Sequence, residues 1–254
     1  MELNQRICII TGGGSGIGKA TAIALAFEGA IVHLVGRTLS KLEDVKEIIE
    51  KTDGRSLCHN VNITDEAAVN SMVASIADTY GKIDLLINNA GHSSPHRRLL
   101  TTTHEEIQAV IDSNLVGTIH CTKAVVPHMV SMKEGTIINV SSIAGIAPSP
   151  LGGMIYSAAK AAIINFTGFL NKDLENTGIR SSVIIPGEVN TPILDNRPTP
   201  PSRDARDTMV TAEDTADAIL MIVKLPQRAN IPELQIRPTY VRDLSAEIES
   251  ASNS

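Results

Sequence analysis

The chain has 254 residues, a formal net charge of −6, and a composition that is 43% hydrophobic, 20% charged and 2% aromatic. The acidic excess and the scarcity of aromatic residues argue against nucleic-acid binding, which uses clustered cations and stacking rings. No apolar run is long enough to span a membrane, and three scattered cysteines (Cys8, Cys58 and Cys121) are typical of buried thiols in a reducing compartment. We therefore expect a cytoplasmic enzyme that binds neither nucleic acid nor membrane.

The first predicted elements surround a glycine-rich turn. Residues 7–10 are apolar and predict a strand buried on both faces, and residues 19–26 predict a helix. Between them, Gly12 permits a tight turn, Gly16 lets the backbone approach a pyrophosphate, and Gly18 lets helix and strand pack closely. The unpaired N–H groups at the start of the helix then face the anion. The alternative is a tight turn that binds nothing.

The rest of the chain alternates between strand and helix patterns. Thr64 is predicted to cap a helix that ends at Gly81, and Thr103 to begin a long helix through a capping box with Glu106. Gly178 is predicted to end another helix. Further strands are predicted at residues 31–35, 56–62, 83–87, 136–140, 183–185 and 234–236, and further helices at 40–51, 155–177 and 211–225.

This alternation predicts an α/β fold: a Rossmann-type, doubly wound parallel sheet of about seven strands with helices on both faces. Residues 1–254 form a single dinucleotide-binding and catalytic domain in this prediction. Residues 193–208 break the pattern because they are rich in proline and lack a period. We interpret them as a mobile lid over the substrate, in which Arg197, Arg203 and Arg206 are either solvated or attract an acid.

Small, polar or glycine residues follow the predicted strands, at the sheet edge where such folds bind ligands. Any one of these segments is explained as a turn, but all six together indicate a ligand site. They lie at residues 12–18, 36–37, 62–63, 88–91, 141–142 and 186–191.

Tyr156 and Lys160 lie four residues apart on a predicted helix, so their side chains share one face. A nearby ammonium favours the phenolate and lowers the pKa of a tyrosine, which makes the tyrosine more useful in acid–base chemistry at neutral pH. The alternative is a tyrosine with a snorkelling lysine beside it.

Asn114 falls on the apolar face of the helix predicted from Thr103, in line with Val110 and Thr118. A buried amide without hydrogen bonds is costly. Asn114 therefore either caps a neighbouring group or joins a buried polar network that includes water.

The histidines predict no metal site. None of the seven has the spacing to cysteine or carboxylate that metal ligands show. His92 and His96 follow the strand end at residues 88–91, and we interpret them as surface loop residues, with contact to substrate as the alternative.

Six groups of residues occur in an order that resembles the short-chain dehydrogenase/reductase family, in its single-domain form. The resemblance covers essentially the whole chain. The groups are Thr11-Gly12-x-x-x-Gly16-x-Gly18, Asn88-Asn89-Ala90-Gly91, Asn114, Ser142, Tyr156-x-x-x-Lys160 and Pro186-Gly187-x-Val189-x-Thr191.

The resemblance implies a catalytic role for four residues. Tyr156 is the general acid/base that exchanges a proton with the substrate oxygen, and Ser142 donates a hydrogen bond to the same oxygen. Lys160 binds the nicotinamide ribose and lowers the pKa of Tyr156, and Asn114 holds a water that links Lys160 to solvent. The interval between Ser142 and Tyr156 is one residue longer than the commonest family spacing, so Ser141 is the alternative to Ser142.

The resemblance also implies the dinucleotide site. Val189 and Thr191 hold the nicotinamide carboxamide, and Asn62 stands where many members carry an Asp beside the adenine. The cofactor-binding residues are Gly12, Gly14, Ser15, Gly16, Ile17, Gly18, Arg37, Thr38, Asn62, Ile63, Asn89, Ala90, Gly91, Tyr156, Lys160, Pro186, Gly187, Val189 and Thr191.

The expected cofactor is NADP(H) rather than NAD(H). An NAD site carries an Asp or Glu about 20 residues past the glycine motif, whereas residues 29–41 contain no acidic side chain. Arg37 instead offers a planar set of donors suited to a 2′-phosphate, and Thr38 adds a hydroxyl. The alternative is that Arg37 is solvated.

Together these features predict an oxidoreductase that moves hydride between NADP(H) and a carbonyl or secondary alcohol of a small molecule. The alternatives are a catalytically silent NADP(H)-binding redox sensor, an NAD-dependent alcohol dehydrogenase of the same fold, and an epimerase or dehydratase of the family's extended branch. The resemblance also implies a homo-oligomer, a tetramer or a dimer, in which the helices from Thr103 and from Ile155 pair across a twofold axis.

Overall fold

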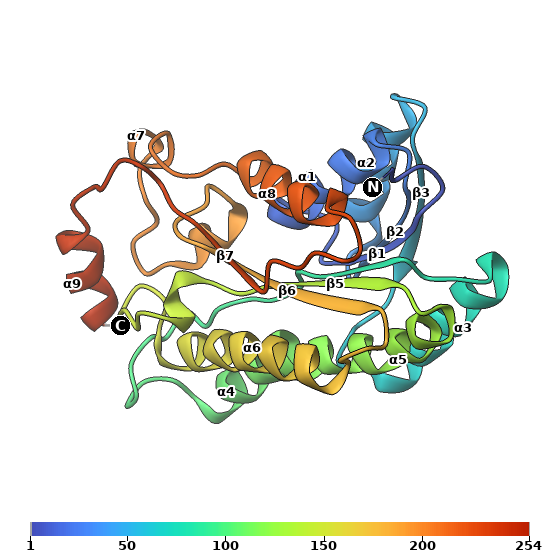
Figure 1. The fold of residues 1–254 in the computed structure, drawn as a ribbon. Coiled ribbons are helices and arrows are strands. Elements are labelled where there is room, and N and C mark those ends of the chain that lie inside the picture. The colour runs from blue at the N-terminus through green and yellow to red at the C-terminus, as the bar shows by residue number, and fades with distance from the viewer. Residues whose placement is uncertain (1, 254) are drawn as a thin grey trace.

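Among residues 2–253, which the computed structural model describes, seven parallel strands form one sheet in the spatial order β3-β2-β1-β4-β5-β6-β7 (Figure 1). Because the strands are parallel, all of them end at the same edge of the sheet, and the strand order reverses between β1 and β4. The strands are β1 (Ile7–Thr11), β2 (Ile31–Gly36), β3 (Arg55–Asn60), β4 (Leu85–Asn88), β5 (Gly135–Val140), β6 (Ile179–Pro186) and β7 (Glu233–Ile236).

Helices cover both faces of this sheet. Helices α1, α2 and α8 lie over one face, and α3, α5 and α6 over the other (Figure 1). The predicted doubly wound α/β fold is thereby confirmed. The helices are α1 (Gly16–Phe27), α2 (Leu39–Glu50), α3 (Glu66–Tyr80), α4 (His104–Ile111), α5 (Gly117–Met132), α6 (Met154–Asp173), α7 (Arg203–Arg206), α8 (Ala212–Lys224) and α9 (Ser245–Asn253), with shorter segments η1 (Asp112–Val116), η2 (Ile143–Gly145) and η3 (Pro192–Asn196).

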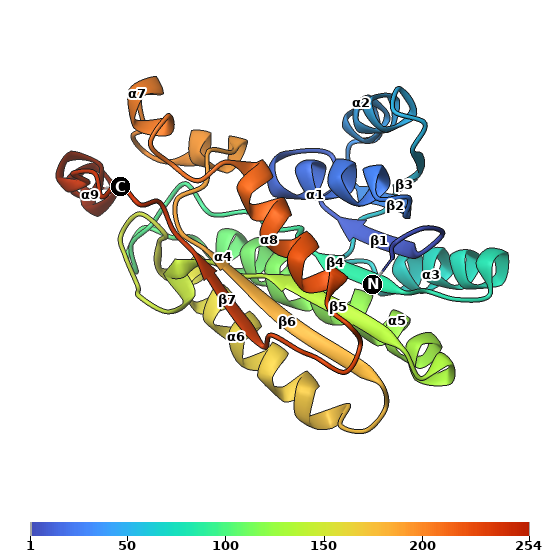
Figure 2. The same ribbon diagram turned by 45° about the horizontal axis from the view of Figure 1, so that its top comes forward.

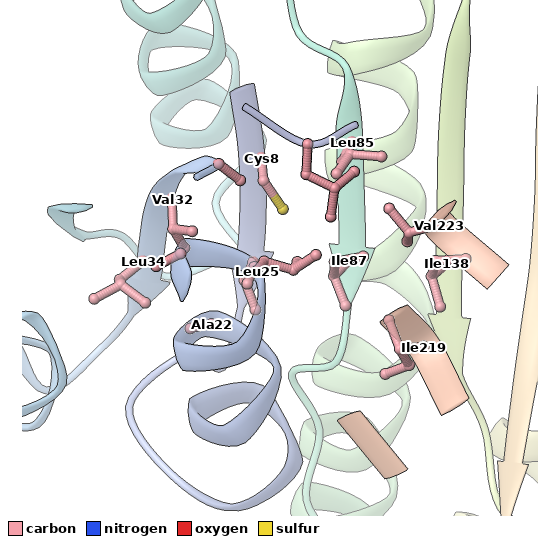
Figure 3. Packing of buried hydrophobic residues seen from close by; sticks show 14 of the residues in the cluster. Cys8, Ala22, Leu25, Val32, Leu34, Leu85, Ile87, Ile138, Ile219 and Val223 are labelled. Atoms are coloured by element: carbon pink, nitrogen blue, oxygen red, sulfur yellow. The ribbon is translucent and has the colours of Figure 1, made fainter. Parts of the chain in front are cut away.

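The alternation of side chains along each strand divides the interior into two aliphatic cores. In β1, Cys8 and Ile10 point toward α1 and α8, whereas Ile7 and Ile9 point toward α3 and α5. Figure 3 shows the first of these cores, where Leu25 lies against the β1 and β4 side chains. Each large side chain buried in this way contributes about 1.5–3 kcal/mol to folding, so the aliphatic strands explain why few aromatic residues are needed. The three cysteines are free thiols: Cys8 and Cys121 are buried, and Cys58 is half-buried.

Two of the predicted helix signals are confirmed, and a third is wrong. Thr103 and Glu106 form a reciprocal capping box, and Gly81 ends α3 with a φ of 70°. Thr64, however, does not cap α3. The cap is Asp65, whose carboxylate accepts from the Ala68 N–H at 3.0 Å.

The long helix predicted from Thr103 is interrupted. It runs through α4 and α5 and continues past Pro127, but η1 between them is a π-helix. Such a widened turn places one extra residue per turn, and it frequently marks a functional site. The helix predicted at residues 155–177 ends earlier, at Asp173, with Leu174 as its cap. The prediction that Gly178 ends this helix is therefore wrong, and Gly178 instead turns the chain before β6 with a φ of 84°.

Residues 193–208 contain two short helical segments, most of η3 and all of α7, rather than irregular chain throughout. Both views place α7 and α9 beyond the same end of the sheet (Figures 1 and 2). Arg197 pairs with Glu188 and Glu247, each at 2.8 Å, and Arg206 pairs with Asp195. The interpretation of these two arginines as solvated is therefore wrong, because each forms ion pairs with carboxylates of the chain. Mobility of the segment stays a prediction.

A buried arginine joins the sheet to the end of α8. Arg180, at the start of β6, is 3% exposed and donates from Nε to Thr136 Oγ1 at 3.0 Å. Its four other N–H groups donate to carbonyl oxygens at the end of α8 and in the following turn, those of Ile222, Val223, Pro226 and Ala229, at 2.6–3.2 Å. All five N–H groups of the guanidinium therefore have acceptors.

We predict that Arg180→Met lowers the free energy of unfolding by about 3 kcal/mol, because it leaves carbonyls of the α8 terminus without donors and removes a cation from the helix C-terminus. Urea denaturation followed by circular dichroism measures this. Arg55→Met is the control, since Arg55 is exposed and donates only to Gln5. Equal midpoints for the two variants would contradict the assigned role.

Candidate active site

Two cavities open at the carboxyl edge of the sheet, and the glycine turn lies between them. The larger has a volume of about 440 Å³ and the smaller about 350 Å³. Both are lined by Gly12, Ser15, Ala90 and Gly91. All of the predicted site residues except Gly18 and Asn114 line one or both of these cavities.

The glycine turn has the geometry that its spacing predicts. Gly12 and Gly16 have φ values of 66° and 51°, which residues other than glycine rarely adopt. A Cβ on Gly18 would lie 2.3 Å from the Gly12 carbonyl oxygen and 2.5 Å from Asn89 Nδ2. Gly18 therefore acts through packing and lies outside both cavities. Ser15 caps α1 through an extended backbone without a side-chain cap hydrogen bond, so the first N–H groups of α1 remain open to an anion.

Hydrogen bonds fasten the ends of β1 and β4 together. Thr11 Oγ1 accepts from the backbone N–H groups of Asn89 and Ala90, both at 3.0 Å. Asn89 Nδ2 donates in return to the carbonyls of Thr11 and Gly12 at 3.1 and 3.2 Å. The segment at residues 89–91 is thus held against the glycine turn.

Tyr156 and Lys160 share one face of the first turns of α6, as their spacing predicts. Lys160 Nζ lies 5.5 Å from the centroid of the Tyr156 ring and donates to the Val140 carbonyl at 2.9 Å. Burial lowers the pKa of Lys160 to about 8. Burial raises the pKa of Tyr156, while a hydrogen bond from Ser142 and the charges of Arg97 and Arg197 act in the opposite direction.

The two adjacent serines at the end of β5 point in different directions. Ser141 is buried and its hydroxyl donates to the Lys160 carbonyl at 2.7 Å. Ser142 is half-buried and its hydroxyl contacts Tyr156. Successive side chains alternate at a strand end, so only one of the pair can face the tyrosine, and here that residue is Ser142.

Asn114 lies behind the larger cavity, in the π-helical segment η1, and is 1% exposed. Its Nδ2 donates to the carbonyls of Val110 and His92, both at 2.8 Å, so the amide does cap neighbouring groups. Its Oδ1 is buried without a protein hydrogen-bond partner. A Cβ on Gly91 would lie 2.3 Å from this oxygen and 3.4 Å from Lys160 Nζ, which shows how closely the three residues converge.

The smaller cavity extends from the glycine turn to the ends of β2 and β3. Arg37 and Thr38 line it together with Lys41, and all three side chains are exposed. Asn62 and Ile63 also line it, and Asn62 Oδ1 accepts from the Thr64 N–H at 3.3 Å. Lys41 was not among the sequence candidates, although its place in the first turn of the helix predicted at residues 40–51, directly after Arg37 and Thr38, could have revealed it.

The two histidines that follow β4 lie in different environments. His92 lines the smaller cavity, and burial and the nearby Arg37 lower its pKa. His96 is exposed and pairs with Glu106 at 2.9 Å. Within residues 2–253, no three side chains among His, Cys, Asp and Glu gather as metal ligands do.

Comparisons with known proteins agree with this geometry. A family model described as short chain dehydrogenase matches residues 6–201. The chain is 36% identical over 211 residues to the 3-oxoacyl-[acyl-carrier-protein] reductase FabG of Thermotoga maritima, and the match covers 83% of each protein. A metagenomic short-chain oxidoreductase in complex with NADP has 27% identity and a TM-score of 0.82, over 95% of this chain and 100% of that one. The closed form of serine dehydrogenase complexed with NADP+ has 30% identity and a TM-score of 0.83, over 91% and 94%.

We predict that Ser142→Ala raises the pKa of Tyr156 further, because it removes the hydroxyl that favours the phenolate, whereas Ser141→Ala leaves this pKa unchanged. Phenolate absorbance during alkaline titration measures the pKa, in a Tyr80→Phe/Tyr240→Phe background that leaves Tyr156 as the only tyrosine. Circular dichroism at each pH checks that the fold persists. Equal shifts in both serine variants would show that neither hydroxyl is specific to Tyr156.

Proposed function

The chain belongs to the short-chain dehydrogenase family, and we propose that it is an NADP(H)-dependent oxidoreductase that interconverts a carbonyl and a secondary alcohol of a small molecule. One observation carries the proposal. Tyr156, Ser142 and Lys160 converge in a cavity that shares the glycine turn with a second, cation-lined cavity. The names of two relatives, a 3-oxoacyl reductase and a serine dehydrogenase, also describe reduction or oxidation reactions.

The shape of the site fits a nicotinamide dinucleotide. The two cavities meet at Gly12 and Ser15, where open N–H groups of α1 favour a pyrophosphate. The adenosine half then lies toward Arg37 and the nicotinamide half toward Pro186, Val189 and Thr191. When bound, this group supplies a hydride to the carbonyl carbon or accepts one from the alcohol.

The side chains of the larger cavity manage the proton and the substrate oxygen. In reduction, the Tyr156 hydroxyl gives its proton to the carbonyl oxygen, and Ser142 donates a hydrogen bond to that oxygen. A tyrosine is protonated at neutral pH, and burial raises the pKa of Tyr156 further, so the phenol holds the proton that reduction requires. The Lys160 ammonium, fixed by the Val140 carbonyl, holds the nicotinamide ribose, and the orphaned Asn114 Oδ1 supports a proton path toward solvent through Lys160.

The preference for NADP(H) rests on charge. The smaller cavity presents Arg37 and Lys41 with the Thr38 hydroxyl, and residues 29–41 contain no carboxylate to repel a 2′-phosphate. Lys41 strengthens the argument because it adds a second cation on the first turn of α2. The complete set of Tyr156, Ser142 and Lys160 favours an enzyme over a catalytically silent sensor.

We also propose that the protein is a cytoplasmic homo-oligomer. Within residues 2–253, no helix is both long and apolar enough for a membrane crossing. Exposed apolar side chains lie on the two long helices expected to pair, namely Met132 on α5 and Phe169 on α6, which are 52% and 60% exposed. These faces support a tetramer or dimer.

We predict that Tyr156→Phe lowers kcat by about 10³-fold, because the residue that exchanges the proton is lost, while the affinity for NADP(H) stays nearly intact. NADPH absorbance with a panel of ketones, oxo acids, keto sugars and acyl thioesters measures turnover, and NADPH fluorescence measures binding. Tyr240→Phe, at a 62% exposed tyrosine, is the control and should behave as wild type. A fully active Tyr156→Phe variant would move the acid–base role elsewhere.

We further predict that wild type favours NADPH over NADH in kcat/KM and that Gly36→Asp/Arg37→Ala reverses this preference. A Cβ at Gly36 would lie 3.3 Å from the flexible end of Leu42, so the new carboxylate can be accommodated. Arg37→Ala alone should raise the KM for NADPH by about 10- to 100-fold, the cost of a lost charged hydrogen bond.

The control for this prediction is Lys46→Ala, which removes an equal charge from α2 at a residue that pairs with Glu50 outside the cavity. It should leave both KM values unchanged. A wild-type enzyme that uses NADH as well as NADPH would refute the assignment of cofactor.

A further inference from the structure

We propose that Arg97 binds a carboxylate of the substrate, so that the molecule reduced in the larger cavity is an oxo acid. This inference rests on the proposed oxidoreductase function and names its substrate class. Arg97 is 4% exposed and lines the cavity that contains Tyr156 and Ser142.

Arg97 has no counterion within residues 2–253. Its guanidinium donates only to backbone carbonyls: Nη1 to Leu151 and Gly152 at 3.2 and 3.0 Å, and Nη2 to Asn196 at 3.0 Å. Two of its five N–H groups are left over, and one of them, at Nε, is buried without a partner. A buried charge that is neither paired nor fully hydrogen-bonded is costly, and such an arrangement is typical of a site that completes itself with a ligand.

Of the other charged side chains that line the cavity, Lys160 donates to the Val140 carbonyl and is assigned to the nicotinamide ribose, and Arg197 and Glu188 are already paired. Arg197 and Arg242 share two carboxylates, Glu188 and Glu247, in an arrangement of two cations and two anions. Glu188 is the one acidic side chain among the described residues that line the cavity, and it is fully engaged there. Arg97 therefore contributes one uncompensated positive charge.

The electrostatics of Arg97 follow from this imbalance. Burial and the neighbouring Arg197 lower its pKa to about 10, so the guanidinium still carries its charge at neutral pH. The missing charge is a single negative one, which fits a carboxylate better than a phosphate ester, since the latter carries nearly two. The delocalised guanidinium also suits the planar carboxylate geometrically.

Arg97 is fixed relative to the reacting centre. Its carbonyl accepts from the Met154 N–H at 3.0 Å, two residues before Tyr156. A Cβ on Gly153 would lie 2.8 Å from Arg97 Cδ, so this glycine lets the arginine pack against the start of α6. The guanidinium and the Tyr156 phenol line one cavity and each shifts the pKa of the other, so the carboxylate and the oxo group lie close together in the substrate. Aliphatic side chains of Leu151, Leu194 and Leu244 line the remaining wall and favour an apolar chain.

The test compares oxo acids with their uncharged methyl esters. With NADPH, linear 2-, 3- and 4-oxo acids should exceed their esters in kcat/KM. Arg97→Met should lower kcat/KM for the preferred acid by about 100-fold, mainly through KM, and leave the ester nearly unchanged. Arg97→Lys should restore part of the preference because it returns the charge.

The matched control is Arg98→Met, which removes a charge beside Arg97 at an exposed residue that lines neither cavity. It should keep the wild-type preference for the acid. An Arg97→Met variant that slows acid and ester equally would show that Arg97 only fastens the loops at Leu151 and Asn196, and the proposal would fall. A wild type that prefers the ester, or shows no preference, would overturn it without reference to any variant.

A binding measurement separates this proposal from the proposed function. With NADP+ present, an oxo acid forms a complex that cannot react, so calorimetry with 2-oxohexanoate and methyl 2-oxohexanoate reports binding alone. Tighter binding of the acid in wild type, lost in Arg97→Met, supports the carboxylate site even if no carbonyl is turned over. Absence of NADPH oxidation across the whole panel would refute the proposed function instead, and equal binding of acid and ester would refute the carboxylate site.

Discussion

The close approach of Gly18 to the Gly12 carbonyl and Asn89 is the contact on which the rest of the site depends. It sets the start of α1 directly over the junction of β1 and β4, at distances that no Cβ would permit. Hydrogen bonds from Asn89 and Ala90 to Thr11 then close the junction. Because the strand order reverses here, the two cavities open on opposite sides of one turn, and a long ligand can cross from one to the other.

Burial sets the chemistry on the far side of that turn. It favours the neutral form of both members of the Tyr156–Lys160 pair, and so raises the pKa of the phenol and lowers that of the ammonium. Both pKa shifts thus favour the state in which the phenol and the amine are uncharged. Ser142, Arg97 and Arg197 oppose this effect at Tyr156. Besides Lys160, the positive charge near the phenol comes from two arginines that line the same cavity, so the proposed mechanism ties proton transfer to the charge of the substrate.

Local sequence signals predicted most of the fold and the centre of the site. Glycine spacing, the capping box at Thr103, and the four-residue interval from Tyr156 to Lys160 each act within one or two turns of chain, so spacing alone reveals them. Other features depend on tertiary contacts. Helical periodicity cannot show the widened turn at Asn114, since the four-residue steps from Val110 to Asn114 and on to Thr118 also fit a regular helix. Arg97 follows no motif, and its significance appears only when the fold leaves it buried without a carboxylate.

The central claim is that this cavity transfers hydride between NADP(H) and a substrate carbon. Isotope transfer tests it most directly: NADPH deuterated at one face of C4 of the nicotinamide is incubated with the enzyme and the best carbonyl of the panel, and the product is examined by mass spectrometry. The account predicts that one deuterium enters the carbinol carbon from one of the two C4 isotopomers and none from the other, because a fixed site presents a single face. A reduced product without deuterium from either isotopomer would contradict it.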